Sequence, residues 1–140
     1  MLAEAVRRLA ALGEVESFAP VIHSAPLGPS SRRYANSAAV LATRLGPDAL
    51  LVELKGLEAH IGRRRGGQRW SARVLDCDIV LWSGGVRRAK ALTIPHPAFR
   101  RRAFVLLPAV ALAPDWRDPA TGLRVRHLLA RLTRPRPAIR

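Results

Sequence analysis

The sequence is poor in cysteine, in aromatic residues and in long apolar runs. Its 140 residues include one cysteine, Cys77, and aromatic side chains make up 5% of the chain. A single cysteine excludes an internal disulfide and, without a Cys/His cluster, gives no zinc signature, so a reducing cytoplasm is the expected location. No apolar run approaches the roughly 20 residues of a membrane helix, and the first residues lack the plan of a signal peptide. We therefore expect a cytoplasmic protein without membrane contact, and we take a monomer as the expected state.

Acidic residues and lysine are also scarce. The chain has 24 basic and 10 acidic residues, a formal net charge of +14 and a pI near 11.8. Such a charge favours anionic ligands and, taken alone, would nominate a nucleic-acid binder. Only Lys55 and Lys90 are lysine, however, and so much arginine beside alanine and proline is typical of a GC-rich genome. The charge is therefore weak support for nucleic-acid binding.

The length and the hydrophobic content of 49% fit one globular domain, which we place at residues 1–133, followed by a flexible Arg/Pro tail at residues 134–140. Apolar periodicity predicts helices at residues 1–12, from Pro47 to about Ile61, and at residues 125–132, with a helical run at residues 99–111. Strands are expected at residues 15–22, 34–43 and 74–82.

Details of these elements follow from the same patterns. Gly13 is placed as a helix C-cap. In the run at residues 99–111, Phe104, Leu107 and Val110 are expected to face inward. Near the end of the second helix, Glu58 and His60 by themselves indicate ordinary surface positions.

The strand at residues 74–82 carries two acids, Asp76 and Asp78, among aliphatic and aromatic side chains. Alternation along a strand puts Leu75, Cys77, Ile79 and Leu81 on one face, and both acids on the other with Val80 and Trp82. Two same-face side chains start about 6.6 Å apart, close enough for their carboxylates to converge on one metal-bound group.

Basic side chains surround this acidic pair in the sequence: Arg63, Arg65, Arg69 and Arg73 precede it, and His96 and residues 100–102 follow. Magnesium is usually held by one or two carboxylates together with phosphate oxygens, and arginine offers a planar fork for phosphate. His96 stands between Pro95 and Pro97, which stiffen its segment. The pattern favours a polyphosphate held between magnesium ions and arginines. No GxxxxGK[ST] motif occurs, so a P-loop is not indicated.

Motifs across nearly the whole chain resemble those of the 6-hydroxymethyl-7,8-dihydropterin pyrophosphokinase family of folate biosynthesis. They are Ser24-x-Pro26-Leu27-Gly28, Tyr34-x-Asn36, Gly62-Arg63-x-Arg65, Arg69-Trp70-x-x-Arg73-x-Leu75-Asp76-x-Asp78-Ile79, and Pro95-His96 followed by Ala103-Phe104. The resemblance implies an α+β fold with a ferredoxin-like antiparallel sheet and helices packed on it. It also implies an ATP-dependent diphosphokinase that moves the β,γ-pyrophosphoryl group of ATP onto the pterin hydroxymethyl group and releases AMP.

The resemblance also assigns residues. It implies that Asp76 and Asp78 hold two Mg²⁺ ions and that Arg63 and Arg73 neutralise the transferred group. The ATP site would comprise Glu58, Arg65, Ile79, Thr93, His96 and Arg102. The pterin would lie between Trp70 and Phe104, surrounded by Ser24, Pro26, Leu27, Tyr34 and Asn36. Aromatic faces suit a planar heterocycle, and an amide supplies the hydrogen-bonding specificity that stacking lacks.

The chain departs from the family pattern at its start, in the loop after Gly28, where Ser30-Ser31-Arg32-Arg33 stands in place of the family's more usual Gln and Pro, and in the ATP site. Family members begin with a strand that carries a Gly-Ser-Asn motif, whereas this chain starts at the following helix, so the resemblance implies an N-terminally truncated form. A basic residue of the family's ATP site is replaced by Ala91, and Arg87, Arg88 and Lys90 are the candidates to compensate.

Three other interpretations compete with this one. Ferredoxin-like sheets with basic faces bind RNA, but they use exposed aromatics, which are few here, and the two acids would repel phosphate in the absence of metal. An inactive, truncated family member is the second. A nucleotide-sugar transferase that uses Asp-x-Asp with metal is the third, and 140 residues are short for its donor domain.

Overall fold

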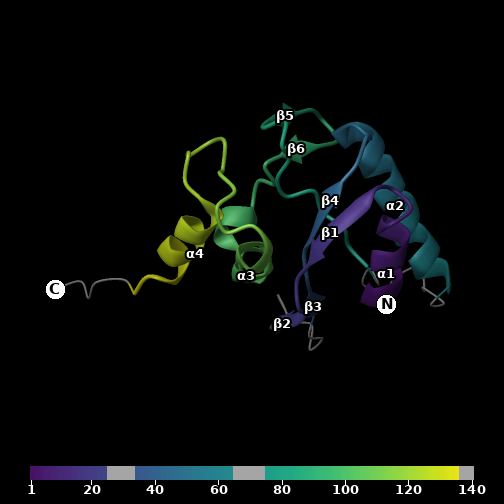
Figure 1. The fold of residues 1–140 in the computed structure, drawn as a ribbon, viewed down its shortest axis with the longest axis horizontal. Coiled ribbons are helices and arrows are strands. Elements are labelled where there is room, and N and C mark those ends of the chain that lie inside the picture. The colour runs from purple at the N-terminus through teal and green to yellow at the C-terminus, as the bar shows by residue number, and fades with distance from the viewer. Residues whose placement is uncertain (25–33, 65–74, 136–140) are drawn as a thin grey trace. The chain divides into compact units, whose positions relative to one another are not determined.

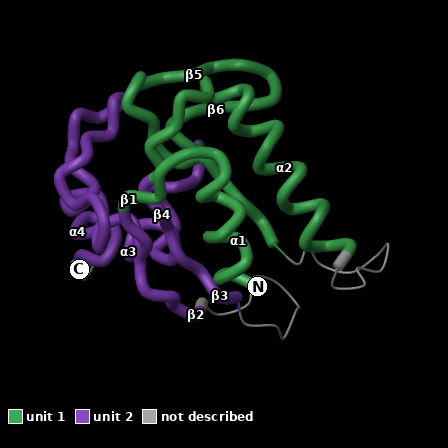
Figure 2. Tube along the Cα trace, turned by 45° about the vertical axis from the view of Figure 1, so that its right-hand side comes forward, with its two compact units in different colours: residues 1–16, 41–96 green, residues 17–40, 97–140 purple. Residues whose placement is uncertain are grey.

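A computed structural model of the chain describes residues 1–24, 34–64 and 75–135 (Figure 1). Five of the predicted site residues, Pro26, Leu27, Arg65, Trp70 and Arg73, lie outside these ranges. The described chain falls into two compact units, which Figure 2 colours separately. Unit 1 comprises residues 1–16 and 41–96, and unit 2 comprises residues 17–40 and 97–140. Each unit is described by itself below.

Unit 1 is built around two helices, α1 (Leu2–Leu9) and α2 (Pro47–Arg64). Pro47 suits the first turn of α2 because its fixed φ is helical and its missing N–H would have no partner there. Asp48 in the same turn places negative charge near the positive end of the helix dipole. The apolar stripe of α2 supplies Leu57 and Ile61 to a core that Ala5 of α1 and Leu75 complete. Full burial of a side chain such as Ile61 stabilises the fold by about 1.5–3 kcal/mol.

The end of α1 differs from the prediction. The helix ends at Leu9 with Ala10 as its C-cap in a right-handed conformation, so Gly13 is not the C-cap. A Cβ at Gly13 would collide with the carbonyl of Ala42. Glycine is needed here because two backbone segments approach closely, and not because of a positive φ.

The strands form three two-stranded sheets. β1 (Glu14–Phe18) pairs with β4 (Ala39–Ala42). β2 (Ile22–Ser24) and β3 (Tyr34–Asn36) are antiparallel, as are β5 (Arg87–Arg88) and β6 (Thr93–Ile94). Helices with small antiparallel sheets confirm the α+β class. A single ferredoxin-like sheet and the N-terminal truncation stay predictions.

The prediction of a strand at residues 74–82 is wrong for residues 75–82, which belong to no strand. Two of their backbone groups have other partners. The N–H of Cys77 donates to a side chain of α2, and the carbonyl of Val80 accepts from the N–H of His96 at 3.0 Å. The segment is therefore held by individual hydrogen bonds and not by a ladder.

The strand predicted at residues 34–43 is interrupted. β3 ends at Asn36 and β4 begins at Ala39. Between them the hydroxyl of Ser37 donates to the carbonyl of Ala19 at 2.6 Å, and the N–H of Ala19 donates to the carbonyl of Ala38 at 2.8 Å. These bonds divert the chain at residues 37–38.

Unit 2 contains the short 3₁₀ helix η1 (Phe99–Arg101), α3 (Ala103–Leu112) and α4 (Val125–Thr133). α3 packs against α4, and Phe99, Leu106 and Val125 are fully buried. The inward face predicted for α3 is wrong at Leu107, whose exposed fraction is 46%, while Leu106 and Pro108 are buried. The helix begins at Ala103 after a separate turn, which rotates its buried face relative to a helix continuous from Phe99.

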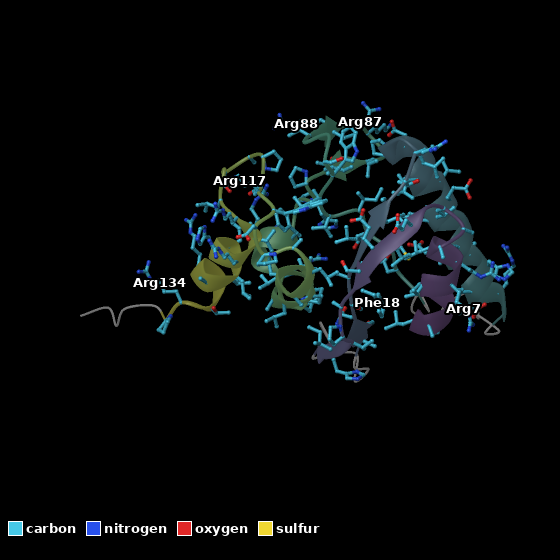
Figure 3. The ribbon with its side chains drawn as sticks, in the orientation of Figure 1. Arg7, Phe18, Arg87, Arg88, Arg117 and Arg134 are labelled. Atoms are coloured by element: carbon cyan, nitrogen blue, oxygen red, sulfur yellow. The ribbon has the colours of Figure 1, made fainter. Side chains whose placement is uncertain are left out.

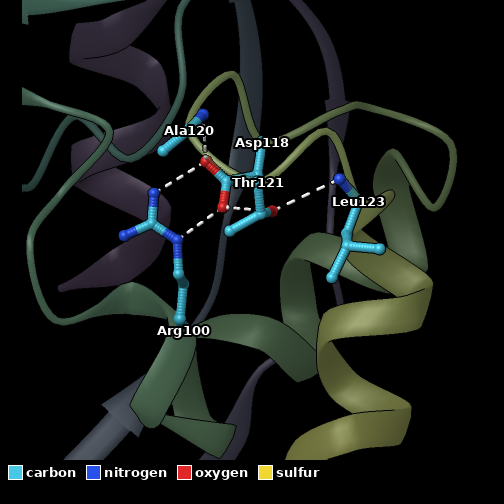
Figure 4. A network of polar contacts seen from close by, with 5 residues as sticks. All are labelled: Arg100, Asp118, Ala120, Thr121 and Leu123. Atoms are coloured by element: carbon cyan, nitrogen blue, oxygen red, sulfur yellow. Dashed lines mark hydrogen bonds and ion pairs between the residues drawn. The ribbon is translucent and has the colours of Figure 1, made fainter.

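One buried acid organises the loop before α4. Asp118 is fully buried and accepts hydrogen bonds from Nε and Nη2 of Arg100 at 2.5 and 2.7 Å (Figure 4). It also accepts from the hydroxyl of Thr121 at 2.8 Å and from the N–H of Ala120 at 3.0 Å. A buried carboxylate needs such partners, and these bonds lower the pKa of Asp118 to about 2.

None of the helices in the described ranges has the length and apolar character to cross a bilayer.

Candidate active site

The acidic segment at residues 75–82 keeps the predicted alternation although it is not a strand. Leu75 is buried and Cys77, Ile79 and Leu81 are half-buried, whereas Asp76 and Asp78 are exposed. Of the other two residues assigned to the acidic face, Trp82 is exposed and Val80 is half-buried. Extended backbone alternates its side chains whether or not it pairs with another strand. Both carboxylates are therefore accessible to a ligand.

Glu58 of α2 fixes the peptide between these acids. One of its carboxylate oxygens accepts a hydrogen bond of 2.7 Å from the N–H of Cys77, and its side chain is only 10% exposed. Lys55, one turn earlier on the same helix, lies 3.4 Å from the other oxygen. The surface position predicted for Glu58 from the helix pattern is thus wrong.

Cys77 packs against the core formed by α1, α2 and Leu75. Burial, followed by the negative charges of Glu58, Asp76 and Asp78, raises the pKa of the Cys77 thiol to about 12. The nucleophilic and metal-binding form of cysteine is the thiolate. Cys77 is therefore protonated at neutral pH and serves packing.

His96 lies beside the acidic pair. Its Nε2 is 3.8 Å from Oδ2 of Asp78, and its backbone N–H bonds the carbonyl of Val80. The preceding Pro95 is buried. The structure thus brings together two residues, Asp78 and His96, that the sequence placed in one phosphate-binding site.

The hairpin β5–β6 leads directly to His96. It presents Thr93, which is exposed, while the adjacent Ile94 is fully buried. Arg87 and Arg88 lie on its first strand (Figure 3). Arg87 donates through Nη2 and Nε to Asp48 of α2 at 2.8 and 3.1 Å, which ties the hairpin to the start of that helix.

The remaining predicted residue of unit 1 is Arg63, in the last turn of α2, whose side chain is exposed. The role of Arg63 stays a prediction.

Unit 2 holds the predicted pterin-binding residues that the structure describes, together with Arg102. Ser24 pairs with Tyr34 in the β2–β3 hairpin, and the Asn36 amide donates to the carbonyl of Tyr34 at 3.3 Å. This hairpin contacts α3. Near the start of α3, the Arg102 guanidinium lies 5.7 Å from the ring centroid of Phe104. Unit 2 thus contains four predicted pterin-site residues together with Arg102, a predicted ATP-site residue.

The acidic pair fits magnesium. Across the described ranges, no group of three or more His, Cys, Asp or Glu side chains could hold a metal ion by itself. Two exposed carboxylates supply hard oxygen ligands and leave the remaining positions to phosphate oxygens and water, which is how magnesium is commonly bound. Asp76 and Asp78 are the residues that would hold it.

Two polar contacts of the structure were not predicted from the sequence. His60 is not a free surface residue, because Nη2 of Arg8 bonds its Nε2 at 2.5 Å, and Arg100 meets Asp118 as described above. Their partners lie 52 and 18 residues away, so no local pattern identifies them. The aspartate flanked by Pro119 and Gly122 indicates a turn but not its buried partner.

Exposed paired acids beside a histidine define a site suited to metal-assisted transfer of phosphoryl groups. The chain matches the model of the 7,8-dihydro-6-hydroxymethylpterin-pyrophosphokinase family over residues 1–114. It belongs to that family of pyrophosphokinases.

Three similar proteins all carry the name 2-amino-4-hydroxy-6-hydroxymethyldihydropteridine pyrophosphokinase. The one from Synechocystis is 36% identical over 116 residues, which are 83% of this chain and 59% of the relative. The one from Pseudomonas aeruginosa is 42% identical over 112 residues, 79% of this chain and 68% of the relative. The one from Methylorubrum extorquens is 36% identical over 135 residues, 94% of this chain and 84% of the relative. The chain thus spans about three fifths of the Synechocystis protein.

Proposed function

We propose that this chain transfers the β,γ-pyrophosphoryl group of ATP to 6-hydroxymethyl-7,8-dihydropterin in folate biosynthesis, with two Mg²⁺ ions, in the cytoplasm and as a monomer. The pterin hydroxymethyl oxygen attacks the β-phosphorus of ATP and the bond from that phosphorus to the α-phosphate oxygen breaks. AMP leaves, the hydroxyl proton is released, and the product is the pterin diphosphate. Family membership supports the reaction, and residues 75–82 with His96 support the site.

Asp76 and Asp78 are exposed on a segment that Glu58 holds by a hydrogen bond, and His96 lies beside Asp78. This arrangement is the main support for the proposal. Pyrophosphoryl transfer needs positioning and charge compensation more than covalent chemistry. Magnesium held by Asp76 and Asp78 would neutralise phosphate charge. Fixing the Cys77 peptide sets the spacing of the two carboxylates before the substrate arrives.

Arginines would complete the charge compensation. Arg63 is exposed at the end of α2, and Arg102 lies at the start of α3. We propose, on the family resemblance, that Arg63 and Arg73 face the transferred group and that Arg65, Thr93, Ile79, His96, Glu58 and Arg102 line the ATP site. A guanidinium fork matches phosphate oxygens and keeps its charge at any pH of interest.

The pterin site in this proposal uses the β2–β3 hairpin and the start of α3. Asn36 would match the donors and acceptors of the ring, and Phe104 would stack on it opposite Trp70, with Ser24, Pro26, Leu27 and Tyr34 around it. Phe104 already carries a planar cation, the Arg102 guanidinium, against its ring. A ring face that accepts one flat group is suited to another.

The decisive experiment measures AMP formation from ATP and magnesium with and without 6-hydroxymethyl-7,8-dihydropterin. The proposal expects AMP only when both the pterin and the metal are present, and EDTA should abolish it. AMP formation independent of the pterin, or none under any condition, would overturn the proposal. Binding of the purified chain to RNA in the second case would favour the basic RNA-binding interpretation.

A further inference from the structure

We propose that Arg88 is a nucleotide-binding residue of this chain, contacting the phosphates of ATP from the β5–β6 hairpin. The inference rests on the proposed function and adds to it a residue outside the set that the resemblance assigns. It also resolves which of the three basic residues near Ala91 faces the nucleotide.

The hairpin register places Arg88 directly opposite Thr93, and Arg87 opposite Ile94. Residues opposite each other in an antiparallel pair project from the same face, and neighbours along a strand project from opposite faces. Ile94 is fully buried and Thr93 is exposed, so the two faces differ in environment. Arg88 therefore shares the exposed face with Thr93, and Thr93 is three residues before His96 in the sequence.

Arg87 is already engaged. Two of its guanidinium nitrogens donate to Oδ2 of Asp48, at 2.8 and 3.1 Å, on the face shared with Ile94. Its charge is therefore compensated within unit 1. Its role is to hold the hairpin against the first turn of α2, which orients the strand that carries Arg88.

Lys90 is placed differently. It lies in the turn that joins β5 to β6, inside the pair of backbone hydrogen bonds between Ala89 and Leu92 at 2.9 and 3.3 Å. Lys90 therefore has no register partner in the hairpin. Arg88 and Lys90 are both exposed, and within the described ranges neither forms an ion pair, so the position opposite Thr93 is what distinguishes Arg88.

A polyphosphate that starts on the metal ions at Asp76 and Asp78 would next meet His96, whose Nε2 is 3.8 Å from Oδ2 of Asp78. Thr93 lies three residues before His96 in the sequence, and Arg88 lies opposite Thr93 in the hairpin. An uncompensated guanidinium on the face of Thr93 supplies the positive charge and the forked donors that phosphate needs.

The test compares four variants with the wild-type chain: Arg88→Ala, Arg88→Lys, Lys90→Ala and Arg131→Ala. Arg131 is exposed on α4, far from the hairpin in sequence. Arg131→Ala therefore removes the same charge as Arg88→Ala and serves as the matched control. Steady-state assays give kcat and the KM for each substrate. Equilibrium titration with the magnesium complex of α,β-methylene-ATP gives nucleotide affinity independently of turnover.

We expect Arg88→Ala to raise the KM for ATP and the Kd of the analogue about 10- to 100-fold, the range for hydrogen bonds to charged groups. The KM for the pterin should stay within about twofold, as expected for a residue that contacts only the nucleotide. Arg88→Lys should restore part of the loss, and Arg131→Ala should behave as wild type.

Equal affinities for Arg88→Ala and Arg131→Ala, or a larger loss for Lys90→Ala, would overturn the assignment of Arg88. Wild-type chain that binds the analogue but forms no AMP would overturn the proposed function while the titrations still decide Arg88. Wild-type chain that binds no nucleotide would overturn both.

Discussion

The carboxylate of Glu58 accepts a hydrogen bond of 2.7 Å from the N–H of Cys77, the residue between Asp76 and Asp78. This bond joins α2 to the acidic segment, which belongs to no strand in the described structure. Individual hydrogen bonds replace a sheet ladder here, and the bond to Glu58 is the one that holds the peptide between the two acids. Glu58 is therefore a positioning residue for the two acids.

Glu58→Ala should lower both stability and metal affinity. It leaves the N–H of Cys77 without its acceptor, which costs about 1–3 kcal/mol. We expect a lower urea midpoint together with a higher Mg²⁺ concentration for half-maximal AMP formation. Glu58→Gln keeps an acceptor oxygen and should retain most of the stability. A Glu58→Ala variant that loses stability with an unchanged Mg²⁺ requirement would contradict the positioning role.

Asp78→Asn should abolish metal-dependent turnover and leave the fold intact. The Asp78 side chain is 43% exposed, and surface substitutions usually change stability by less than about 0.5 kcal/mol. Turnover is measured as AMP release over a Mg²⁺ titration, and folding by urea denaturation. Glu53→Gln, which removes an exposed acid of α2, is the matched control and should keep full activity. Normal turnover in Asp78→Asn would refute the metal assignment.

Phe104→Ala should weaken pterin binding far more than ATP binding. A lost aromatic contact is expected to raise the KM for the pterin at least about tenfold, because stacking contributes about 0.5–1.5 kcal/mol beyond the buried area. Phe104→Tyr keeps the ring face and serves as the control. The two KM values are compared under saturating partner substrate, and equal increases in both would exclude the stacking role.

The pair of Arg100 and Asp118 predicts a specific response to acid. The pKa of Asp118 is lowered from 3.8 to about 2, chiefly by the hydrogen bond from Arg100. A lowered pKa means that the unfolded state binds more protons, so this stabilisation is complete above about pH 4 and is lost as pH falls towards 2. Unfolding free energies of wild type and Asp118→Asn should therefore converge between pH 4 and 2. A difference that is constant over this range would contradict the assignment.

Removing the carboxylate altogether should be costly at neutral pH. Breaking a buried ion pair by deleting one partner typically destabilises a protein by about 3–5 kcal/mol. Asp118→Ala also orphans the donors at Ala120 and Thr121. The midpoint of thermal unfolding of this variant should lie well below that of Asp115→Ala, because Asp115 is exposed and its ion pairs within the described residues are long, at 3.4 and 3.8 Å.

Local sequence predicted the helices well because their signals are local. Pro47 and Asp48 mark the start of α2, and Leu54, Leu57 and Ile61 are buried as the apolar stripe predicts. The predicted helix at residues 125–132 corresponds to α4. Where a separate turn precedes the helix, as at Phe99–Arg101, the predicted inward face was wrong at Leu107.

Strands were harder to predict because a strand depends on a partner that the local pattern does not specify. Residues 75–82 have the composition of a strand and the alternation of one, yet they use Glu58 and His96 as hydrogen-bond partners. The candidate acids were predicted from their spacing, from the basic residues around them in the sequence and from the family resemblance. The contacts that hold them, from Glu58 and His96, lie 19 and 18 residues away from Cys77 and Asp78 and could not be read from periodicity.

The lone thiol between the two acids gives the chain a built-in reporter of its own ligand. Asp76 and Asp78 each help to keep the pKa of Cys77 near 12. A cation bound to both would offset that part of the elevation, leaving burial and Glu58 to account for the rest. Alkylation of Cys77 at mildly alkaline pH should therefore accelerate as magnesium binds, unless the bound ligand shields the sulfur. Because the chain has no second cysteine, the rate of alkylation would report on this one site and hence on occupancy of the acidic pair.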